Sequence, residues 1–206
     1  MPNNLHYKKD TLFSTYFYRF ENKKLALELK KYILSLKELS GIESNIAPTI
    51  KQNLVESKFD FFKTDEKVID KTKKFFASCI KVVLNDLQDS NDNYRVRFNE
   101  AWYHIGKKNS SHDVHTHTNC SWCGVFYVQS GDPDGNGETK FSSPITYNYT
   151  DLGTSAINEE VASVIPEDGK LVIFPSYLKH YQSLYTGNQD RIVVAFNSSI
   201  IDKIPS

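Results

Sequence analysis

The stretch HDVHTH at residues 112–117 contains three of the six histidines in this 206-residue chain. Neutral imidazole is the commonest protein ligand for metals near pH 7, and it suits iron, zinc, copper and nickel. Side chains alternate between the two faces of an extended strand. Asp113, His115 and His117 are therefore expected on one face, and His112 on the other. Two imidazoles on one face can bind a single ion, with a third ligand from a distant segment.

His180, in the segment PSYLKHYQ, is the only histidine after residue 117 and is the candidate for the distant ligand. Two histidines and a carboxylate on one triangular face are typical of non-haem Fe(II) oxygenases. The sequence supplies the histidines clearly and the carboxylate less clearly. Arg191 lies eleven positions after His180 and opens the segment RIVVAFN. Because an arginine can bind a carboxylate through two charge-assisted hydrogen bonds, Arg191 is a candidate for holding a small diacid.

The elements that position these residues differ between the two parts of the chain. Apolar residues recur at every third or fourth position in 21–39 and 65–87, which predicts two helices joined by an extended, loop-rich link at 46–62. After residue 92 the pattern predicts short strands bounded by turn residues, at 94–105, 120–129, 170–176 and 191–200. Several short strands without a helical period are typical of an antiparallel sandwich or barrel.

The expected fold is mainly β with flanking helices, a double-stranded β-helix (jelly roll) with the helical part packed on it. We expect one domain over residues 1–206, with 1–91 as mostly helical support and 92–206 as the jelly-roll core that holds the metal site. The helical part is expected either to support the barrel or to form a homodimer.

The composition excludes several classes of function. The formal net charge is zero, so no overall field would attract nucleic acid. No apolar run is long enough for a membrane span or a signal peptide. Three cysteines, an odd number, argue against a full disulfide framework and for the cytoplasm. Cys120 and Cys123 form a C-x-x-C motif, but on a strand they would face opposite sides, which favours packed thiols over a redox or zinc pair.

The ordered set of residues resembles the Fe(II)/2-oxoglutarate-dependent oxygenases over residues 94–200. In that superfamily an H-x-D/E pair and a distant histidine bind iron, and an arginine or lysine further along binds the C5 carboxylate of 2-oxoglutarate. His115, His117, His180 and Arg191 follow this order. The segments GVFYV, GNGETKF and PEDGKLVIFPSYLKH resemble the prolyl-4-hydroxylase-like branch, and the whole pattern is most similar to a group of bacterial and phage 2-oxoglutarate oxygenases.

The resemblance implies a hydroxylase that couples the decarboxylation of 2-oxoglutarate to succinate with oxidation of a C–H bond by Fe(II) and O2. It implies that Arg191 anchors the cosubstrate and that Tyr127 helps to hold it. Asn119 and Asn197 are further candidates, either for the cosubstrate or for the ring nitrogens of the ligating histidines. No catalytic residue is expected beyond the metal site.

The third metal ligand stays open at this point. The position where the superfamily carries a carboxylate is occupied by His117. The site is then either a set of three histidines or a set in which Asp113 supplies the carboxylate, and the position in the pattern favours His117. Glu138 is a weaker candidate, because the resemblance places it beyond the metal-binding strand.

Three other functions remain possible for such a sequence. Three histidines and a water molecule also form a catalytic zinc site, so a zinc-dependent jelly-roll hydrolase or lyase is one alternative. A jelly-roll binding protein without catalysis is the second, because the acidic ligand is missing, and a structural or interaction protein whose histidines are incidental is the third. The prime substrate cannot be read from the residues; the resemblance to prolyl hydroxylases suggests a protein or peptide side chain, and a small molecule is equally compatible with the fold.

Overall fold

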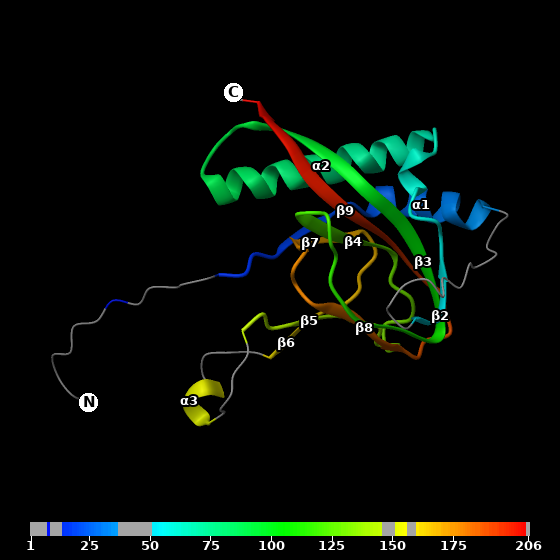
Figure 1. Cartoon of the computed structure of the whole chain (residues 1–206). Coiled ribbons are helices and arrows are strands. Elements are labelled where there is room, and N and C mark those ends of the chain that lie inside the picture. Colours follow the sequence, from blue (N-terminus) through cyan, green and yellow to red (C-terminus); the bar gives the residue numbers. More distant parts are fainter. Residues whose placement is uncertain (1–7, 9–13, 37–50, 146–150, 156–159, 205–206) are drawn as a thin grey trace.

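The computed structural model describes residues 8, 14–36, 51–145, 151–155 and 160–204. The N-terminal segment, the end of the first predicted helix and the start of the predicted link lie wholly or partly outside this range. The elements run along the chain (Figure 1) as β1 (Tyr18–Glu21), α1 (Lys23–Ser35), β2 (Lys51–Glu56), the 3-10 helix η1 (Phe61–Lys63), α2 (Lys67–Gln88), β3 (Asn93–His115), β4 (Trp122–Gln129), β5 (Thr139–Ser142), α3 (Leu152–Ser155), β6 (Val161–Val164), β7 (Lys170–Pro175), β8 (His180–Tyr185) and β9 (Arg191–Ile204).

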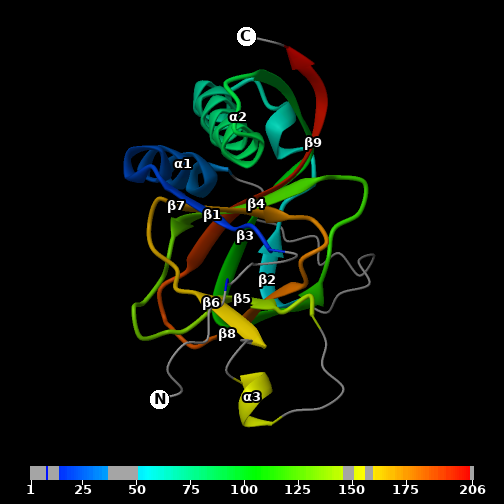
Figure 2. The ribbon, with the colours of Figure 1, turned by 90° about the vertical axis from the view of Figure 1, so that its left-hand side faces the viewer.

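The strands form one curled antiparallel sheet. Their order is β1-β7-β4-β9-β3-β8-β5-β6, and β2 also pairs with β3. The long strand β3 pairs with β9 from Asn93 to Gly106 and with β8 from Ser110 to His115, so it belongs to both halves of the sheet. The half that contains β4, β7 and β9 lies opposite the half that contains β5, β6 and β8 (Figure 2). The predicted fold class, mainly β with a jelly roll and flanking helices, is confirmed.

Helices α1 and α2 cover the outer face of the first half (Figures 1 and 2). The Asn22 side chain caps α1 by accepting a hydrogen bond from the Leu25 N–H at 3.0 Å. On α2, Phe76 stacks on Phe196 of β9, with ring centroids 4.8 Å apart, and meets Phe126 of β4 at 5.5 Å. The helices therefore support the two strands whose other faces line the interior of the jelly roll.

Alternation along β9 separates two cores. Val194 and Phe196 face the helices, whereas Val193 packs in the interior between the two halves of the sheet. The same alternation directs Arg191 inward, and the side chain is 2% exposed. The interior core also contains Phe141 and other residues of β4, β5 and β7.

The N-terminal part contributes more than helices. Strand β1 extends the sheet by pairing with β7, and β2 pairs with β3 within the segment that the sequence predicted as a link. Helices α1 and α2 pack on the sheet, and the division of the chain into a helical support and a jelly-roll core stays a prediction. The predicted homodimer stays a prediction.

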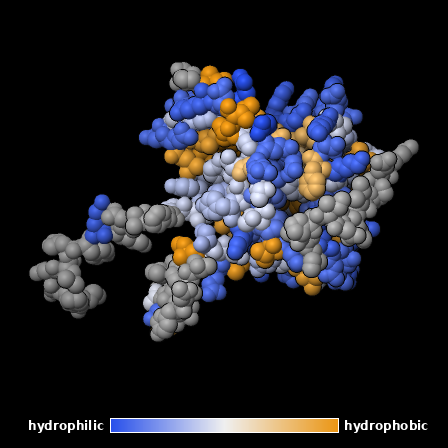
Figure 3. Space-filling model, in the orientation of Figure 1, coloured by the Kyte–Doolittle hydropathy of each residue, from blue (hydrophilic) through white to orange (hydrophobic). Residues whose placement is uncertain are grey.

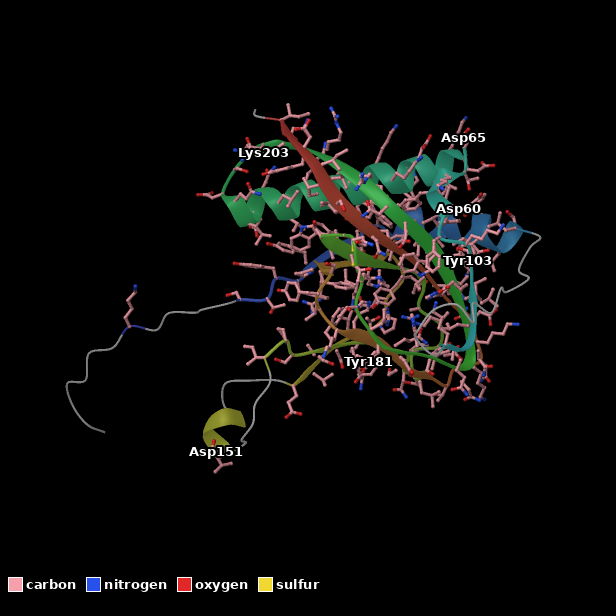
Figure 4. All side chains as sticks on the ribbon, viewed as in Figure 1. Asp60, Asp65, Tyr103, Asp151, Tyr181 and Lys203 are labelled. Atoms are coloured by element: carbon pink, nitrogen blue, oxygen red, sulfur yellow. The ribbon has the colours of Figure 1, made fainter. Side chains whose placement is uncertain are left out.

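Side chains from the two halves of the sheet can be located in Figure 4. Tyr103 on β3 packs edge-on against Phe61, with centroids 5.2 Å apart, whereas Tyr181 lies on β8 in the opposite half (Figure 4).

The face shown in Figure 3 is mostly hydrophilic, and its apolar residues lie in several separate areas. None of the helices in the described part of the chain combines the length and the apolar character that a membrane crossing requires.

Candidate metal centre

Three histidines from two segments meet at one end of the interior. His115 is the last residue of β3 and lies opposite His180, the first residue of β8, in the antiparallel register. His117 follows just after β3, where its N–H donates to the Ser176 carbonyl at 3.2 Å. One ligand atom from each of the three rings lies within 4.8 Å of the others. Strand pairing thus brings together residues that are 63 positions apart, namely His117 and His180.

Backbone carbonyls orient two of these rings. The Nδ1–H of His115 donates to the Asp113 carbonyl at 2.7 Å, and the Nδ1–H of His180 donates to the Leu178 carbonyl at 2.9 Å. Because a carbonyl only accepts, each ring carries its hydrogen on Nδ1, and its Nε2 carries a lone pair that can accept a hydrogen bond or bind a metal. The Nε2 atoms of His117 and His180 are 3.3 Å apart. Three convergent imidazoles of this kind form a donor set that suits a divalent transition metal.

Burial keeps these imidazoles neutral. Burial and the neighbouring His115 lower the pKa of His117 to about 4, and they lower the pKa of His180 to about 3. Burial likewise lowers the pKa of His115. Near pH 7 all three rings are therefore unprotonated, which is the form that binds metal ions.

The predicted orientation of His112 is wrong. Strict alternation directs it away from His115, but the two rings stack with centroids 4.1 Å apart and planes inclined by 22°. The cause is local irregularity, because the register between β3 and β8 shifts on both sides of His112. His112 also lies edge-on to His104, at 5.6 Å between centroids. A fourth imidazole, His112, thus contacts His115, and a fifth, His104, contacts His112.

The two acidic candidates lie outside the group of three histidines. Asp113 is exposed, and its backbone carbonyl, rather than its carboxylate, contacts the His115 ring. Glu138 lies just before β5, where its carboxylate is 3.6 Å from the Lys140 ammonium. Within the described residues, the only cluster with metal-binding geometry is His115, His117 and His180.

A small cavity connects the histidines to Arg191. The cavity has a volume of about 50 Å³, and its lining includes the three histidines, Arg191 and Gln182. One guanidinium N–H of Arg191 donates to the Gln182 Oε1 at 2.7 Å, while the Arg191 Nε has no hydrogen-bond partner among the described residues. No described acidic side chain pairs with Arg191, and burial lowers the pKa of this guanidinium. A buried, uncompensated cation is costly, so the cavity favours an anionic ligand.

Tyr127 lies against Arg191. The guanidinium carbon is 5.4 Å from the centroid of the Tyr127 ring, which stabilises the cation. The Tyr127 hydroxyl donates to the Thr139 Oγ1 at 2.7 Å, and Thr139 lines the cavity. The sequence did not single out Thr139 or Gln182. Gln182 lies two residues after His180 on β8, so strand alternation is the signal that would have found it.

An outer pocket adjoins the metal centre. It has a volume of about 700 Å³ and is lined by His115 and His117, by the aromatic side chains Phe59 and Trp102, and by polar residues that include Arg97, Glu100, Asn119 and Asn197. Trp102 lines both the pocket and the inner cavity. The Asn197 amide donates to the Glu100 carboxylate at 2.9 Å, and Asn119 is exposed. The four residues predicted to bind cosubstrate are thus divided: Arg191 lines the inner cavity, Tyr127 packs behind it against the guanidinium, and the two asparagines line the outer pocket.

A buried charge cluster supports the same region. The Glu56 carboxylate, on β2, accepts hydrogen bonds from the His104 Nε2 at 2.6 Å and from the Lys51 ammonium. Although burial opposes ionisation, these partners lower the pKa of Glu56 to about 2. No sequence pattern indicates this cluster, because it depends on the pairing of β2 with β3.

The fold and the three-histidine site fit one class of protein, the jelly-roll Fe(II)/2-oxoglutarate oxygenases. Residues 100–197, just under half of the chain, match the sequence family described as "Putative 2OG-Fe(II) oxygenase". The match includes all three histidines and Arg191. The predicted enzyme class and its cofactors, Fe(II) and 2-oxoglutarate with O2, are thereby confirmed, and the three-imidazole donor set fits iron. No curated protein matches the chain in sequence.

Two solved structures with TM-scores above 0.5 share the fold. A prolyl-4-hydroxylase from Pseudomonas putida aligns with a TM-score of 0.59 at 12% identity, over 90% of this chain and 94% of that one. HygX from Streptomyces hygroscopicus, with nickel and 2-oxoglutarate bound, aligns with a TM-score of 0.57 at 13% identity, over 90% and 83%. A 2OG-Fe(II) oxygenase from Burkholderia pseudomallei aligns with a TM-score of 0.44 at 12% identity over 58% of this chain, which spans about half (51%) of that protein.

Proposed function

We propose that this oxygenase hydroxylates a C–H bond of a substrate bound in the outer pocket, with Fe(II) held by His115, His117 and His180 and with 2-oxoglutarate anchored by Arg191. The observation that carries the proposal is the environment of Arg191. Its guanidinium is buried, has no acidic partner among the described residues, and lines the same small cavity as the three histidines. A dicarboxylate that reached from the metal to this cation would neutralise it.

His117 is proposed as the third ligand in place of Asp113. The proposal is supported by the 3.3 Å between the Nε2 atoms of His117 and His180, and by the exposed position of Asp113. With three neutral ligands the metal keeps its full positive charge. The two ends of the inner cavity are then both positive, which favours a ligand with a carboxylate at each end.

The chain orients its ligands and closes one side of the site. With O2 as the oxidant, bound Fe(II) and 2-oxoglutarate would supply the oxidation of C–H to C–OH: one oxygen atom enters the hydroxyl group and the other enters succinate, which forms as 2-oxoglutarate loses CO2. The carbonyls of Asp113 and Leu178 fix the rings of His115 and His180. Gln182 and Tyr127 hold the Arg191 guanidinium from two sides. Phe174 packs against His180 at 4.7 Å between centroids and closes the interior side of the site.

We propose a protein or peptide side chain as the substrate. The outer pocket is wide enough for one residue of a peptide, combines two aromatic walls with charged groups of both signs, and adjoins the proposed metal ligands. The similarity to a prolyl-4-hydroxylase from Pseudomonas putida supports this substrate class. A second structure of HygX contains hygromycin B, so a polar small molecule is the alternative that a substrate screen has to include.

Organisation and location are also proposals. We propose a single domain over residues 1–206, with 1–91 as support and 92–206 as the jelly-roll core. We propose the cytoplasm as its location, because Cys79, Cys120 and Cys123 are all free thiols in the structure.

A turnover and binding assay tests the proposed site. Succinate release is measured from anaerobically reconstituted Fe(II) protein after addition of O2 and 2-oxoglutarate, and metal content is measured before the assay. We expect His117→Ala to lose both metal and turnover, and Asp113→Ala, the matched control, to keep both. The opposite pattern would assign the third ligand to Asp113. Tight zinc binding without any succinate release by the wild type would favour the zinc hydrolase instead.

A further inference from the structure

Cys120 and Cys123 lie closer together than the strand pattern predicts. Their Sγ atoms are 3.8 Å apart, although alternation predicts opposite faces. That prediction is wrong because β4 begins at Trp122, so Cys120 precedes the strand and does not follow its alternation. Both thiols are free. The third cysteine, Cys79, is buried in the core between the helices and the sheet, apart from this pair.

The pair can close into a disulfide with a small movement. An S–S bond is about 2.05 Å long, so the sulfur atoms must approach by roughly 1.8 Å. Cys123 is fixed inside the sheet, where it pairs with Phe174 of β7 and Asn197 of β9. Cys120 lies outside any strand and is only half-buried, so its side chain is the one that can move and can meet an oxidant.

The surroundings distinguish the two thiols. The hydrogen bond between the sulfur atoms lowers the pKa of Cys120, with burial acting in the opposite direction. The neighbouring Cys120 and burial raise the pKa of the Cys123 thiol. Cys120 is therefore the more readily ionised and more accessible of the two, as expected for the attacking thiol of a C-x-x-C pair.

We propose that Cys120 and Cys123 are a reversible oxidation site for a hydroperoxide. The Cys120 thiolate attacks one oxygen of H2O2, the O–O bond breaks, and the leaving hydroxide takes up a proton to form water, which leaves a sulfenic acid on Cys120. The Cys123 sulfur then attacks the Cys120 sulfur, and the sulfenic hydroxyl leaves as water with the Cys123 proton. Two thiols and one H2O2 give one disulfide and two water molecules, so the thiols lose the two electrons that the peroxide gains.

Oxidation at this site would reach the outer pocket and the metal centre. The Cys123 S–H donates to the Asn197 Oδ1 at 3.4 Å, and this donor is lost when the disulfide forms. The Cys120 carbonyl accepts from the Ser176 hydroxyl at 2.8 Å, and the Ser176 carbonyl accepts from the His117 N–H. The site therefore connects oxidation to Asn197 in the pocket and to the backbone of a proposed metal ligand. The disulfide itself does not depend on the proposed function.

Peptide mass spectrometry tests the proposal. Metal-free protein is treated with H2O2, denatured, alkylated and digested with trypsin. The peptide 109–140 contains both Cys120 and Cys123, and the peptide 75–81 contains Cys79 as an internal control. We expect peptide 109–140 to become two hydrogens lighter and resistant to alkylation, and dithiothreitol to reverse both changes. Cys79 should stay fully alkylated.

Two variants separate a true pair from two independent thiols. In Cys123→Ser, Cys120 has no partner, so we expect peroxide to carry it to the sulfinic or sulfonic acid. In Cys79→Ala, we expect the disulfide to form as in the wild type. The proposal is overturned if both cysteines of the wild type remain alkylated after peroxide treatment. It is equally overturned if wild-type Cys120 is over-oxidised to the same extent as in Cys123→Ser.

Discussion

Replacement of Arg191 by methionine should remove most of the stabilisation that 2-oxoglutarate confers on the metal-loaded protein. Methionine keeps a long side chain in the buried position but has no charge. In the wild type the guanidinium is 2% exposed and its Nε has no hydrogen-bond partner within the described residues. A bound carboxylate would neutralise this cation, whereas in the variant the same carboxylate would be buried without a positive partner.

The size of the effect follows from the burial of the pair. Loss of one partner of a buried, hydrogen-bonded charge pair costs about 2–5 kcal/mol, and even the lower value weakens binding roughly 30-fold. At a 2-oxoglutarate concentration of about 100 times the wild-type Kd, binding stabilises the wild type by about 2.7 kcal/mol and such a variant by about 0.9 kcal/mol. For a domain of this length, the expected rise in Tm is about 5–11 °C for the wild type and about 2–4 °C for the variant.

Thermal unfolding with Mn(II) in place of iron measures this without turnover. Each protein is heated at increasing 2-oxoglutarate concentrations, and metal binding is measured separately so that loss of the ion is not mistaken for loss of the cosubstrate. Arg95→Met is the control, because Arg95 is exposed and lies 3.9 Å from Asp202. An Arg191→Met protein whose Tm rises as much as that of the wild type would refute the anchoring role.

Three further predictions concern the histidines and their support. The metal-free protein should lose stability as the pH falls below about 6.5. The pKa values of His117 and His180 in the folded state, about 4 and about 3, lie below the value of about 6.5 in the unfolded state. As the pH falls, the unfolded state therefore binds protons first and is stabilised relative to the folded state. Urea unfolding at several pH values checks this, and equal stability at pH 7 and pH 5 would contradict it. Glu56→Gln should lower the free energy of unfolding by about 3 kcal/mol, because it removes the buried carboxylate that pairs with Lys51 and His104. The control Glu28→Gln, which removes an exposed ion pair with Lys71, should change the free energy of unfolding little. Affinity for Ni(II), measured by calorimetry, should be lost in His180→Ala and retained in Asp113→Ala, and a weakened Asp113→Ala would speak for a carboxylate ligand.

The sequence predicted those features that depend on residue type and simple periodicity. Several short apolar strands after residue 92 predicted the jelly roll. Two histidines at alternate positions, a distant histidine and an arginine that opens the following strand indicated the residues that meet inside it. The proximity of His115, His117 and His180 agrees with that pattern. Their role as metal ligands stays a prediction until metal is measured.

Other features depend on pairing between distant segments and could not be predicted. The stacking of His112 on His115 results from shifts in register between β3 and β8. The contact between Glu56 and His104 requires β2 to pair with β3, but the sequence pattern of β2 resembles a loop. Cys120 meets Cys123 because the chain bends before β4 begins.

The position of β3 in both halves of the sheet also determines when the metal site can exist during folding. His115 meets His180 only after β3 has paired with β8, and Arg191 takes its place only after β3 has paired with β9. These pairings join residues far apart in the sequence, and such contacts form late and slowly. A newly made chain therefore cannot bring the three histidines together before β3 has paired with β8. Iron capture at the proposed centre would then report that this long-range pairing has formed.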